Sequence, residues 1–215
     1  MNPTDDNTIW YESISERTTT RLYSAGSVIT LQGETSTQIG FILSGRAKAI
    51  SFSENGEATW VGYFQKDDFF GHTALLTETS PPFEIVAETQ VKVLFVTPNA
   101  INQLLSKQEN LNLEIARDLA KRLDQMTHRL IEAYTLSAKG RVCAELSRLS
   151  RVIGMAPDMQ IIRPNPIFVE LAERVNSTRE TVSRTVSELQ KKGILAREPG
   201  AIIINDPDRL RQNIR

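Results

Sequence analysis

The segment from Ser177 to Arg184 carries residue types that can read the edges of DNA bases. If it is helical, the period of 3.6 residues separates its side chains into a polar arc and an apolar side. The polar arc holds Arg179, Glu180, Ser183, Arg184 and Ser187, and the apolar side holds Val182, Val186 and Leu189. Arginine can donate two hydrogen bonds to O6 and N7 of guanine, and glutamate can accept one from N4 of cytosine. The arc is therefore a candidate surface for reading DNA sequence.

Two other interpretations of Glu180 are open. Ser177 followed three residues later by Glu180 matches a capping box, which predicts that the helix begins at Ser177 and that Glu180 is engaged in the cap. Alternatively, this is an ordinary surface helix in which Glu180 and Arg184 form an i,i+4 salt bridge worth roughly 0.2–0.5 kcal/mol. The neighbouring elements have to decide between these interpretations.

The residues before this segment predict a second, shorter helix. Residues 167–175 follow a start signal at Asn165–Pro166 and place apolar residues near helical spacing. The apolar positions are Ile167, Val169, Leu171 and Val175. Asn176 and Ser177 interrupt the pattern, so two helices joined by a tight turn are expected, as in a helix-turn-helix.

The residues after this segment predict a β-hairpin. Lys191, Lys192 and Gly193 give the longer helix a cationic last turn and a glycine stop. The runs 194–197 and 201–204 then flank a Pro-Gly turn. A hairpin in this place is a wing, which often contacts the phosphate backbone.

Residues 137–215 resemble the DNA-binding domain of the Crp/Fnr family of bacterial transcription regulators. The family's Arg-Glu-Thr-x-x-Arg signature matches Arg179, Glu180, Thr181 and Arg184, and its Gly-Arg-hydrophobic step matches residues 140–142. The resemblance implies that Arg179 and Arg184 read guanines and that Glu180 reads a cytosine, in half-sites similar to TGTGA. It implies base-reading residues Arg179, Glu180, Ser183 and Arg184, and phosphate-binding residues Ser177, Thr178, Thr181 and Arg197.

Charge is distributed unevenly along the chain. Residues 1–136 contain 11 Lys and Arg against 17 Asp and Glu, whereas residues 137–215 contain 14 against 9. An acidic half joined to a basic half is typical of a sensing domain attached to a nucleic-acid-binding domain. A chance difference between two solvated surfaces is the alternative, but it does not explain why the basic half also contains the predicted helix-turn-helix.

Composition excludes several classes of protein. A single cysteine, Cys143, cannot form a disulfide within the chain or hold a cysteine-ligated iron–sulfur cluster, and it is expected to be a small buried residue. There is no apolar run long enough to span a membrane, and residues 1–7 are polar and acidic. We therefore expect no signal peptide, no membrane partner and a cytoplasmic location.

Residues 21–96 predict many short β-strands. Apolar runs alternate with glycines, and the segment 54–57 with its Asn-Gly centre is a strong hairpin turn. Such spacing predicts a sandwich or small barrel. The segment is similar to the Crp/Fnr effector domain, a β-roll that binds cyclic nucleotides in some members. Its turn glycines match Gly26, Gly33 and Gly45, and residues 67–71 resemble the approach to its phosphate-binding cassette.

The resemblance thus covers nearly the whole chain and implies an α+β fold. We expect an N-terminal antiparallel β-roll, similar to a double-stranded β-helix or jelly roll, over residues 1–108. A long dimerisation helix is expected over residues 109–136, and a winged helix-turn-helix over residues 137–215.

The cassette departs from the cyclic-AMP pattern. Where that pattern has Gly-Glu-Leu, with the glutamate on the ribose, this chain has Gly71, His72 and Thr73. Where it has Arg-Ser, this chain has Pro81 and Pro82, which offer neither a charge nor a donor. On the long helix the Thr-Ser pair is replaced by Met126 and Thr127. We therefore expect these residues to form the effector pocket, if one exists, and do not expect cyclic AMP to bind.

The two histidines, His72 and His128, leave a haem site open as an alternative, because some family branches sense gases through haem. The other interpretation is that both are ordinary surface or hydrogen-bonded histidines. Nothing else in the sequence suggests a metal, and no other cofactor is expected.

From Asn110 a long helix is predicted, with apolar residues at intervals of three or four. The stripe consists of Leu111, Ile115, Leu119, Leu123, Met126 and Leu130. It can pack on its own β-roll or form a two-stranded coiled coil, and the resemblance favours the coiled coil, in a homodimer.

The sequence favours a homodimeric regulator that binds double-stranded DNA at a palindromic site, and RNA polymerase if it activates transcription. The alternative is a sensor or scaffold that binds a small molecule or protein and contacts DNA only incidentally. An enzyme is not expected, because no pair of nucleophile and base, metal-ligand cluster or P-loop is present.

Overall fold

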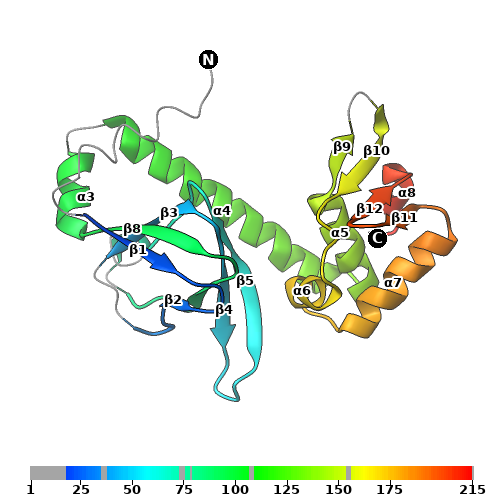
Figure 1. The fold of residues 1–215 in the computed structure, drawn as a ribbon, viewed down its shortest axis with the longest axis horizontal. Helices are drawn as coiled ribbons and strands as arrows, with labels where there is room; N and C mark the ends of the chain where they lie inside the picture. The colour runs from blue at the N-terminus through cyan, green and yellow to red at the C-terminus, as the bar shows by residue number, and fades with distance from the viewer. Residues whose placement is uncertain are drawn as a thin grey trace. The chain divides into compact units, whose positions relative to one another are not determined.

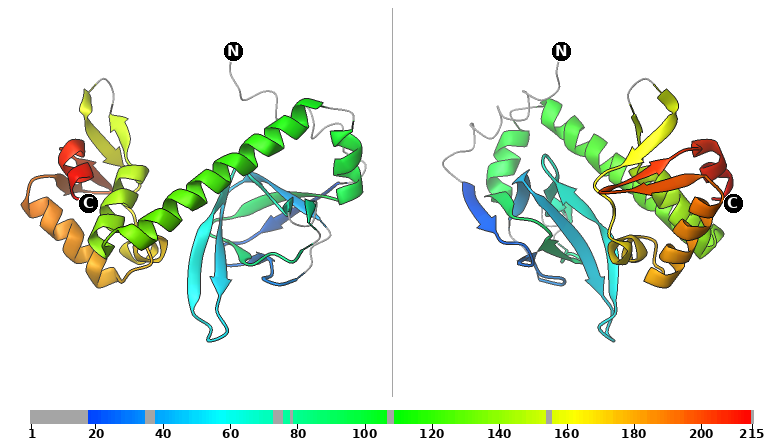
Figure 2. Two further views of the ribbon diagram at one scale, coloured as in Figure 1. Left: turned by 180° about the vertical axis from the view of Figure 1, so that it is seen from behind. Right: turned by 45° about the vertical axis from the view of Figure 1, so that its right-hand side comes forward.

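The computed structural model of the 215-residue chain describes residues 18–34, 38–72, 76–77, 79–106, 109–153 and 156–214. Its elements fall into two compact units, Met1–Leu119 and Ala120–Arg215, and the boundary lies within one helix, α4 (Glu109–Thr135). Figures 1 and 2 show an antiparallel β-fold in the first unit and a mixed helical and β-fold in the second. The expected α+β fold class is confirmed.

The first unit contains two four-stranded sheets. One has the order β1-β8-β3-β6 and the other the order β2-β7-β4-β5, and every pairing is antiparallel. The strands are β1 (Thr18–Tyr23), β2 (Val28–Thr30), β3 (Ile39–Ser44), β4 (Arg46–Phe52), β5 (Ala58–Gln65), β6 (Phe69–Phe70), β7 (Glu84–Ala87) and β8 (Val91–Val96). The predicted turn glycines Gly26, Gly33 and Gly45 all have positive φ angles, which only glycine adopts readily.

Side chains alternate between two cores along β3. Ile42 joins the core of the roll, together with phenylalanines from several strands. Ile39 and Phe41 point to the other face of the sheet, where they pack with Ile101 of α3 (Pro98–Leu105) and with Ile115 of α4. The hairpin turn at Gly56 is also confirmed, and Figure 2 shows the β4–β5 hairpin extending past the other strands.

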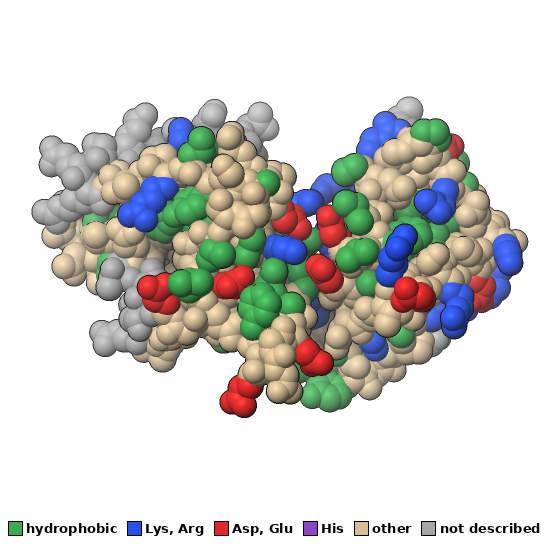
Figure 3. Space-filling view, turned by 60° about the horizontal axis from the view of Figure 1, so that its bottom comes forward, with side chains coloured by type: hydrophobic (Ala, Val, Ile, Leu, Met, Phe, Trp, Pro, Cys, Tyr) green, Lys and Arg blue, Asp and Glu red, His purple; other side chains and the backbone are tan. Residues whose placement is uncertain are grey.

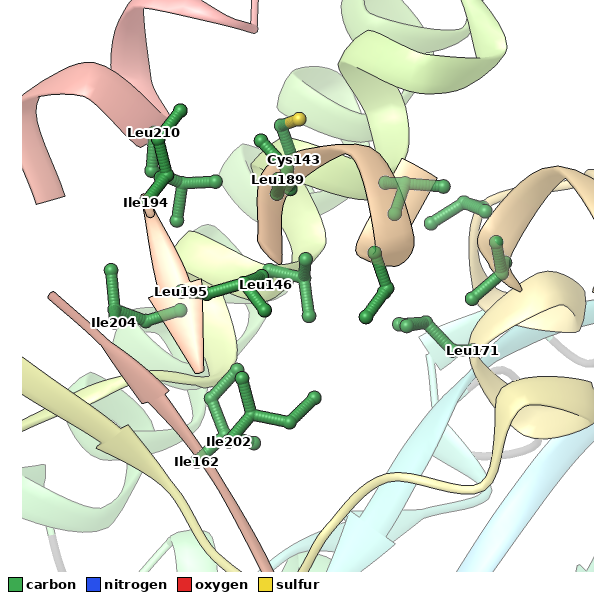
Figure 4. Packing of buried hydrophobic residues seen from close by; sticks show 14 of the residues in the cluster. Cys143, Leu146, Ile162, Leu171, Leu189, Ile194, Leu195, Ile202, Ile204 and Leu210 are labelled. Atoms are coloured by element: carbon green, nitrogen blue, oxygen red, sulfur yellow. The ribbon is translucent and has the colours of Figure 1, made fainter. Parts of the chain in front are cut away.

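The second unit is built around one aliphatic core, shown in Figure 4. Its elements are the end of α4, α5 (Ala138–Leu149), β9 (Arg151–Ile153), β10 (Ala156–Ile162), α6 (Phe168–Arg174), α7 (Arg179–Lys191), β11 (Leu195–Glu198), β12 (Ala201–Ile204) and α8 (Pro207–Gln212). Its strands form one sheet in the order β11-β12-β10-β9. Cys143 is buried in this core as expected, and burial raises the pKa of its thiol to about 11, so it is an inert apolar residue.

Two elements of this unit are absent from the sequence-based expectations. The β9–β10 hairpin could have been found from the apolar runs that flank Gly154, and α8 from Asp206 followed by Pro207. Asp206 caps α8 by accepting a hydrogen bond from the Arg209 N–H at 2.9 Å, with Pro207 in the first turn.

Candidate nucleic-acid interface

The helices α6 and α7 form the predicted helix-turn-helix. Leu171 from the first helix, Val175 directly after it and Val182 from the second helix are buried together in the core. The turn passes through Asn176, whose φ of 46° is left-handed, and the Ser177 N–H donates to the Ala172 carbonyl at 3.0 Å. The turn is therefore closed by backbone hydrogen bonds, which fix where α7 begins.

The predicted capping box at Ser177 is wrong, because the cap is one residue later. Thr178 has an extended backbone, and its hydroxyl accepts a hydrogen bond from the Thr181 N–H at 3.2 Å. Ser177 is instead engaged in the turn through its backbone. The helix consequently spans Arg179–Lys191. The predicted glycine stop is confirmed, because Gly193 follows the C-cap Lys192 with a left-handed φ of 70°.

The amphipathic arrangement of α7 is confirmed. Val182, Val186 and Leu189 are buried, and one buried polar residue that the sequence did not indicate, Thr185, lies between them. The exposed residues of the polar arc are Arg179, Glu180, Ser183, Arg184 and Ser187. Thr178 is also exposed, whereas Ser177 and Thr181 are half-buried.

Glu180 is exposed in the first turn of α7. A hydrogen bond from its own backbone N–H, and then one with the Thr178 hydroxyl, lower the pKa of this carboxyl. It is therefore ionised at neutral pH and can only accept hydrogen bonds, which suits an amino group such as N4 of cytosine.

The inner face of α6 differs from the prediction. Leu171 and Val175 are buried as expected, but Ile167 and Val169 are exposed. The helix starts at Phe168, two residues after Pro166, so its inner face is formed by Phe168 and Ala172 instead. Ile167 is exposed because it is the N-cap residue, and Val169 lies two positions from both Ile167 and Leu171, off the helical period.

The hairpin predicted after α7 is confirmed: β11 and β12 are antiparallel, with Leu195 paired to Ile204 and Glu198 to Ala201. Its turn contains Gly200, with a φ of 76°. The exposed Arg197 lies with its guanidinium carbon 5.1 Å from the centre of the Phe168 ring. This cation–π contact orients Arg197, and it was missed because Phe168 and Arg197 are far apart in sequence.

Lysine and arginine side chains are spread over the face of the C-terminal unit that Figure 3 shows. Some are already paired within the unit: Glu188 of α7 accepts hydrogen bonds from Lys139 at 2.6 Å and from Lys192 at 2.7 Å. These bonds lower the pKa of Glu188 to about 2. Its charge is therefore neutralised by two lysines at neutral pH.

The proline pair of the predicted effector pocket is tied into the roll. The Pro81 carbonyl accepts from the Gly33 N–H at 2.9 Å, and the Pro82 carbonyl accepts from the Ser51 hydroxyl at 2.9 Å. Gly71 follows β6 with a φ of 88°, and the half-buried His72 ring lies 6.3 Å from the Phe69 ring. Thr73 lies outside the described residues.

The other two pocket candidates, Met126 and Thr127, are exposed on α4 and belong to the C-terminal unit. His128 is exposed there too, 3.7 Å from Asp124. Within the described ranges, no group of three or more His, Cys, Asp or Glu side chains is placed to hold a metal ion. Haem iron takes a single proximal histidine in many proteins, so this finding does not bear on the haem alternative for His72 or His128.

The apolar stripe of α4 is divided between two environments. Ile115 packs against the core beside the roll, and Leu119 is half-buried. Leu123, Met126 and Leu130 are exposed, by 68%, 49% and 58%. The side chain of Leu111 lies outside the described residues. None of the helices in the described part of the chain is long and apolar enough to cross a membrane.

Comparison with known proteins gives two family matches. Residues 20–108 match the model of the cyclic nucleotide-binding domain, and residues 140–213 match that of the Crp-like helix-turn-helix domain. The wing and both helices of the helix-turn-helix fall within the second match.

The chain is also similar to curated transcription regulators over most of their length. The chain is 21% identical over 194 residues to a CRP-like cAMP-activated global transcriptional regulator of Mycobacterium tuberculosis, covering 90% of this chain and 87% of that protein. It is 25% identical to the anaerobic regulatory protein of Bacillus subtilis, covering 100% and 92%. Among solved structures, a CooA mutant from Carboxydothermus hydrogenoformans superposes with a TM-score of 0.82 at 16% identity, covering 95% of this chain and 90% of that one.

Proposed function

Because the chain belongs to the Crp/Fnr family of transcription regulators, we propose that it is a homodimer that reads a two-fold symmetric DNA site with the polar arc of α7. The observation that carries the proposal is the exposure of Arg179, Glu180 and Arg184 on one side of a helix whose other side is buried. A helix presented in this way fits the major groove, where base edges carry a distinct pattern of donors and acceptors.

The proposed roles divide the interface into base-reading and phosphate-binding residues. Arg179 and Arg184 would each bind a guanine, and Glu180 would accept from a cytosine, in half-sites similar to TGTGA. Ser183 is small and lets the backbone approach the bases. The proposed phosphate-binding residues are Ser177, Thr178, Thr181 and Arg197. Phe168 supports this role for Arg197, because it holds the guanidinium on the wing.

The proposed dimer contact is the C-terminal half of α4. Leu123, Met126 and Leu130 are apolar, exposed and spaced by three or four residues, and Ile131 and Tyr134 extend the exposed apolar surface. A second copy of this helix would bury them in a coiled coil. Two-fold symmetry would then place the two copies of α7 in major grooves about one helical turn apart.

We further propose that the regulator binds DNA without cyclic AMP. Pro81 and Pro82 stand where a cyclic-AMP site needs an arginine, and their carbonyls are used by Gly33 and Ser51. The proposal assigns no catalytic residue. It implies a cytoplasmic location, with RNA polymerase as a further partner if transcription is activated.

The salt dependence of binding tests the base-reading role. Binding of the purified protein to a selected site and to a scrambled duplex should be measured over a range of salt concentrations. Counterion release gives both duplexes a steep and similar slope of log K against log salt. Base reading adds an offset of about 4 kcal/mol or more in favour of the selected site. Equal affinities at every salt concentration would favour the alternative, a sensor or scaffold with incidental DNA binding.

A further inference from the structure

Helix α5 carries a charged face formed by Arg141, Glu145 and Arg148. These residues are spaced by four and three positions, so they lie on one side of the helix. Arg141 and Glu145 bind segments on both sides of α5 in the chain: the end of α4, and α6 or the turn that follows it. Arg148 binds Glu132 of α4 and Glu145. Every contact lies within the compact unit Ala120–Arg215.

Arg141 connects the end of α4 to the turn of the helix-turn-helix. Its Nη1 donates to the Leu136 carbonyl at 3.0 Å, directly after α4. Its Nε donates to the Val175 carbonyl at 2.8 Å and its Nη2 to the Asn176 carbonyl at 3.0 Å. The planar fork of a guanidinium can bind three carbonyls in different directions, which the single nitrogen of a lysine cannot do in the same way.

Glu145 connects the same elements through ion pairs. It is only 2% exposed and binds three arginines: Arg148 of α5, Arg129 of α4 at 3.5 Å and Arg174 of α6 at 3.5 Å. Arg148 also donates to Glu132 of α4 at 2.6 Å. A buried carboxylate surrounded in this way favours one arrangement of α4, α5 and α6, because moving a helix away breaks its ion pair with Glu145.

We propose that this charged face of α5 sets which spacing between DNA half-sites the protein accepts. The inference rests on the proposed function, a dimer joined through α4. In such a dimer the path from the symmetry axis to the recognition helix runs from α4 through the short connection at Leu136–Ser137. The hydrogen bonds of Arg141 and the ion pairs of Glu145 restrict rotation about that connection. Arg141, Glu145 and Glu132 are thus positioning residues, outside the exposed arc of α7.

The physical reason is geometric. Adding one base pair between the half-sites moves one of them by about 3.4 Å and turns it by about 34–36° around the duplex. If Arg141 and Glu145 hold the connection at Leu136–Ser137, the DNA-binding helices cannot follow this movement without breaking interactions with α4 or α6. If those interactions are weakened, the connection can rotate, and the dimer can bind both spacings.

Two variants test the inference, and each one weakens a different set of interactions: the hydrogen bonds of Arg141 or the ion pair between Glu132 and Arg148. Arg141→Lys keeps the charge but not the fork, and Glu132→Gln weakens the tie from α4 to Arg148. Glu145→Gln is unsuitable, because three arginines would be left around an uncharged buried group. The matched controls are Arg211→Lys and Asp208→Asn, which make the same changes in an exposed ion pair on α8. Melting curves of all four variants identify any that are unfolded at the assay temperature.

The measurement is competition binding to operators whose half-site spacing is the selected one, one base pair shorter or one base pair longer. The wild type and both controls should prefer the selected spacing by about tenfold or more, the scale on which a single mismatched base pair acts. Arg141→Lys and Glu132→Gln should reduce this preference to less than about threefold, with unchanged preference for the bases within each half-site.

The results separate this inference from the proposed function. If the wild type discriminates sharply between spacings and both folded variants do so equally, the inference is wrong and the proposed function stands. If the wild type selects no two-fold symmetric site, the proposed function is wrong and this inference falls with it.

Discussion

In the N-terminal unit aromatic side chains point into the roll, whereas in the C-terminal unit the most polar helix face points to solvent. The Phe64 ring centre lies 5.8 Å from that of Phe70 and 6.4 Å from that of Phe83, and Phe70 lies 6.1 Å from Phe95. On α7 the core is aliphatic, and guanidinium, carboxylate and hydroxyl groups remain exposed. The first unit therefore uses its distinctive residues for packing, and the second leaves them available for a ligand.

This difference determines how readily a residue in each unit can be assigned to packing or to ligand binding. The exposed polar arc of α7 contributes little to core packing, so its donors and acceptors are available to a ligand. A residue inside a roll contributes to stability whether or not a ligand binds beside it. The comparison leads to predictions with effects of very different size.

The largest effect is expected in the roll. Phe70→Ala should lower the free energy of unfolding of the N-terminal unit by about 3–5 kcal/mol, because a buried ring in contact with two other rings leaves a cavity. Urea unfolding monitored by fluorescence measures this. The control Phe52→Ala removes a ring that is 39% exposed and should cost much less. Equal costs would contradict the description of the interior.

The next effect concerns α7. Arg179→Ala should weaken binding to the preferred site by roughly 1–3 kcal/mol and relax the preference at one base position. Arg197→Ala on the wing should weaken binding about equally on preferred and scrambled DNA, because phosphates carry no sequence information. Titrations of both variants on both duplexes measure the difference. If Arg179→Ala behaved as Arg197→Ala does, Arg179 would be a phosphate contact.

A smaller effect, on stability, is expected from the ion pairs that Glu188 of α7 makes with Lys139 and Lys192. The lysines around Glu188 hold its pKa at about 2, below that of the unfolded chain. The carboxylate therefore stabilises the folded state above about pH 4.5, and this contribution is lost as the pH falls toward about 2. The stability difference between the wild type and Glu188→Gln should accordingly be larger at pH 6 than at pH 3.5 in urea unfolding. Glu198→Gln, the same change on the exposed wing, is the control, and a difference that grows toward low pH would contradict the assignment.

The smallest effect is expected from cyclic AMP. A ligand present at about 100 times its dissociation constant stabilises a protein by about 2.7 kcal/mol, which raises the melting temperature by several degrees. Because Pro81 and Pro82 offer neither charge nor donor, millimolar cyclic AMP should leave both the melting temperature and DNA affinity unchanged. A clear rise in either would show that other residues of the roll form a nucleotide site.

Most of the fold could be predicted from the sequence, because its signals are local. Glycines marked the turns of the roll, and the period of α7 correctly separated Val182, Val186 and Leu189 from the polar arc. Element ends were less certain. The cap at Thr178 rather than Ser177, and the exposure of Ile167, depend on which backbone groups the turn uses.

The contacts that connect distant segments could not be predicted in this way. The carbonyls bound by Arg141 are invisible in a sequence, since any residue can supply a backbone carbonyl. The arginines around Glu145 come from three helices, and Phe168 reaches Arg197 only because the wing folds back on α6. These contacts depend on the tertiary arrangement and have no signature in the local pattern.

The most direct test of the central claim is selection of bound sequences from a random DNA library by the purified protein, without added ligand and at fixed near-physiological salt. We expect enrichment of a two-fold symmetric motif with half-sites about one helical turn apart, and loss of one base preference in the Arg179→Ala variant. If no motif were enriched, and a repeat with cell extract as a source of effectors also gave none, the claim that α7 reads DNA sequence would be contradicted.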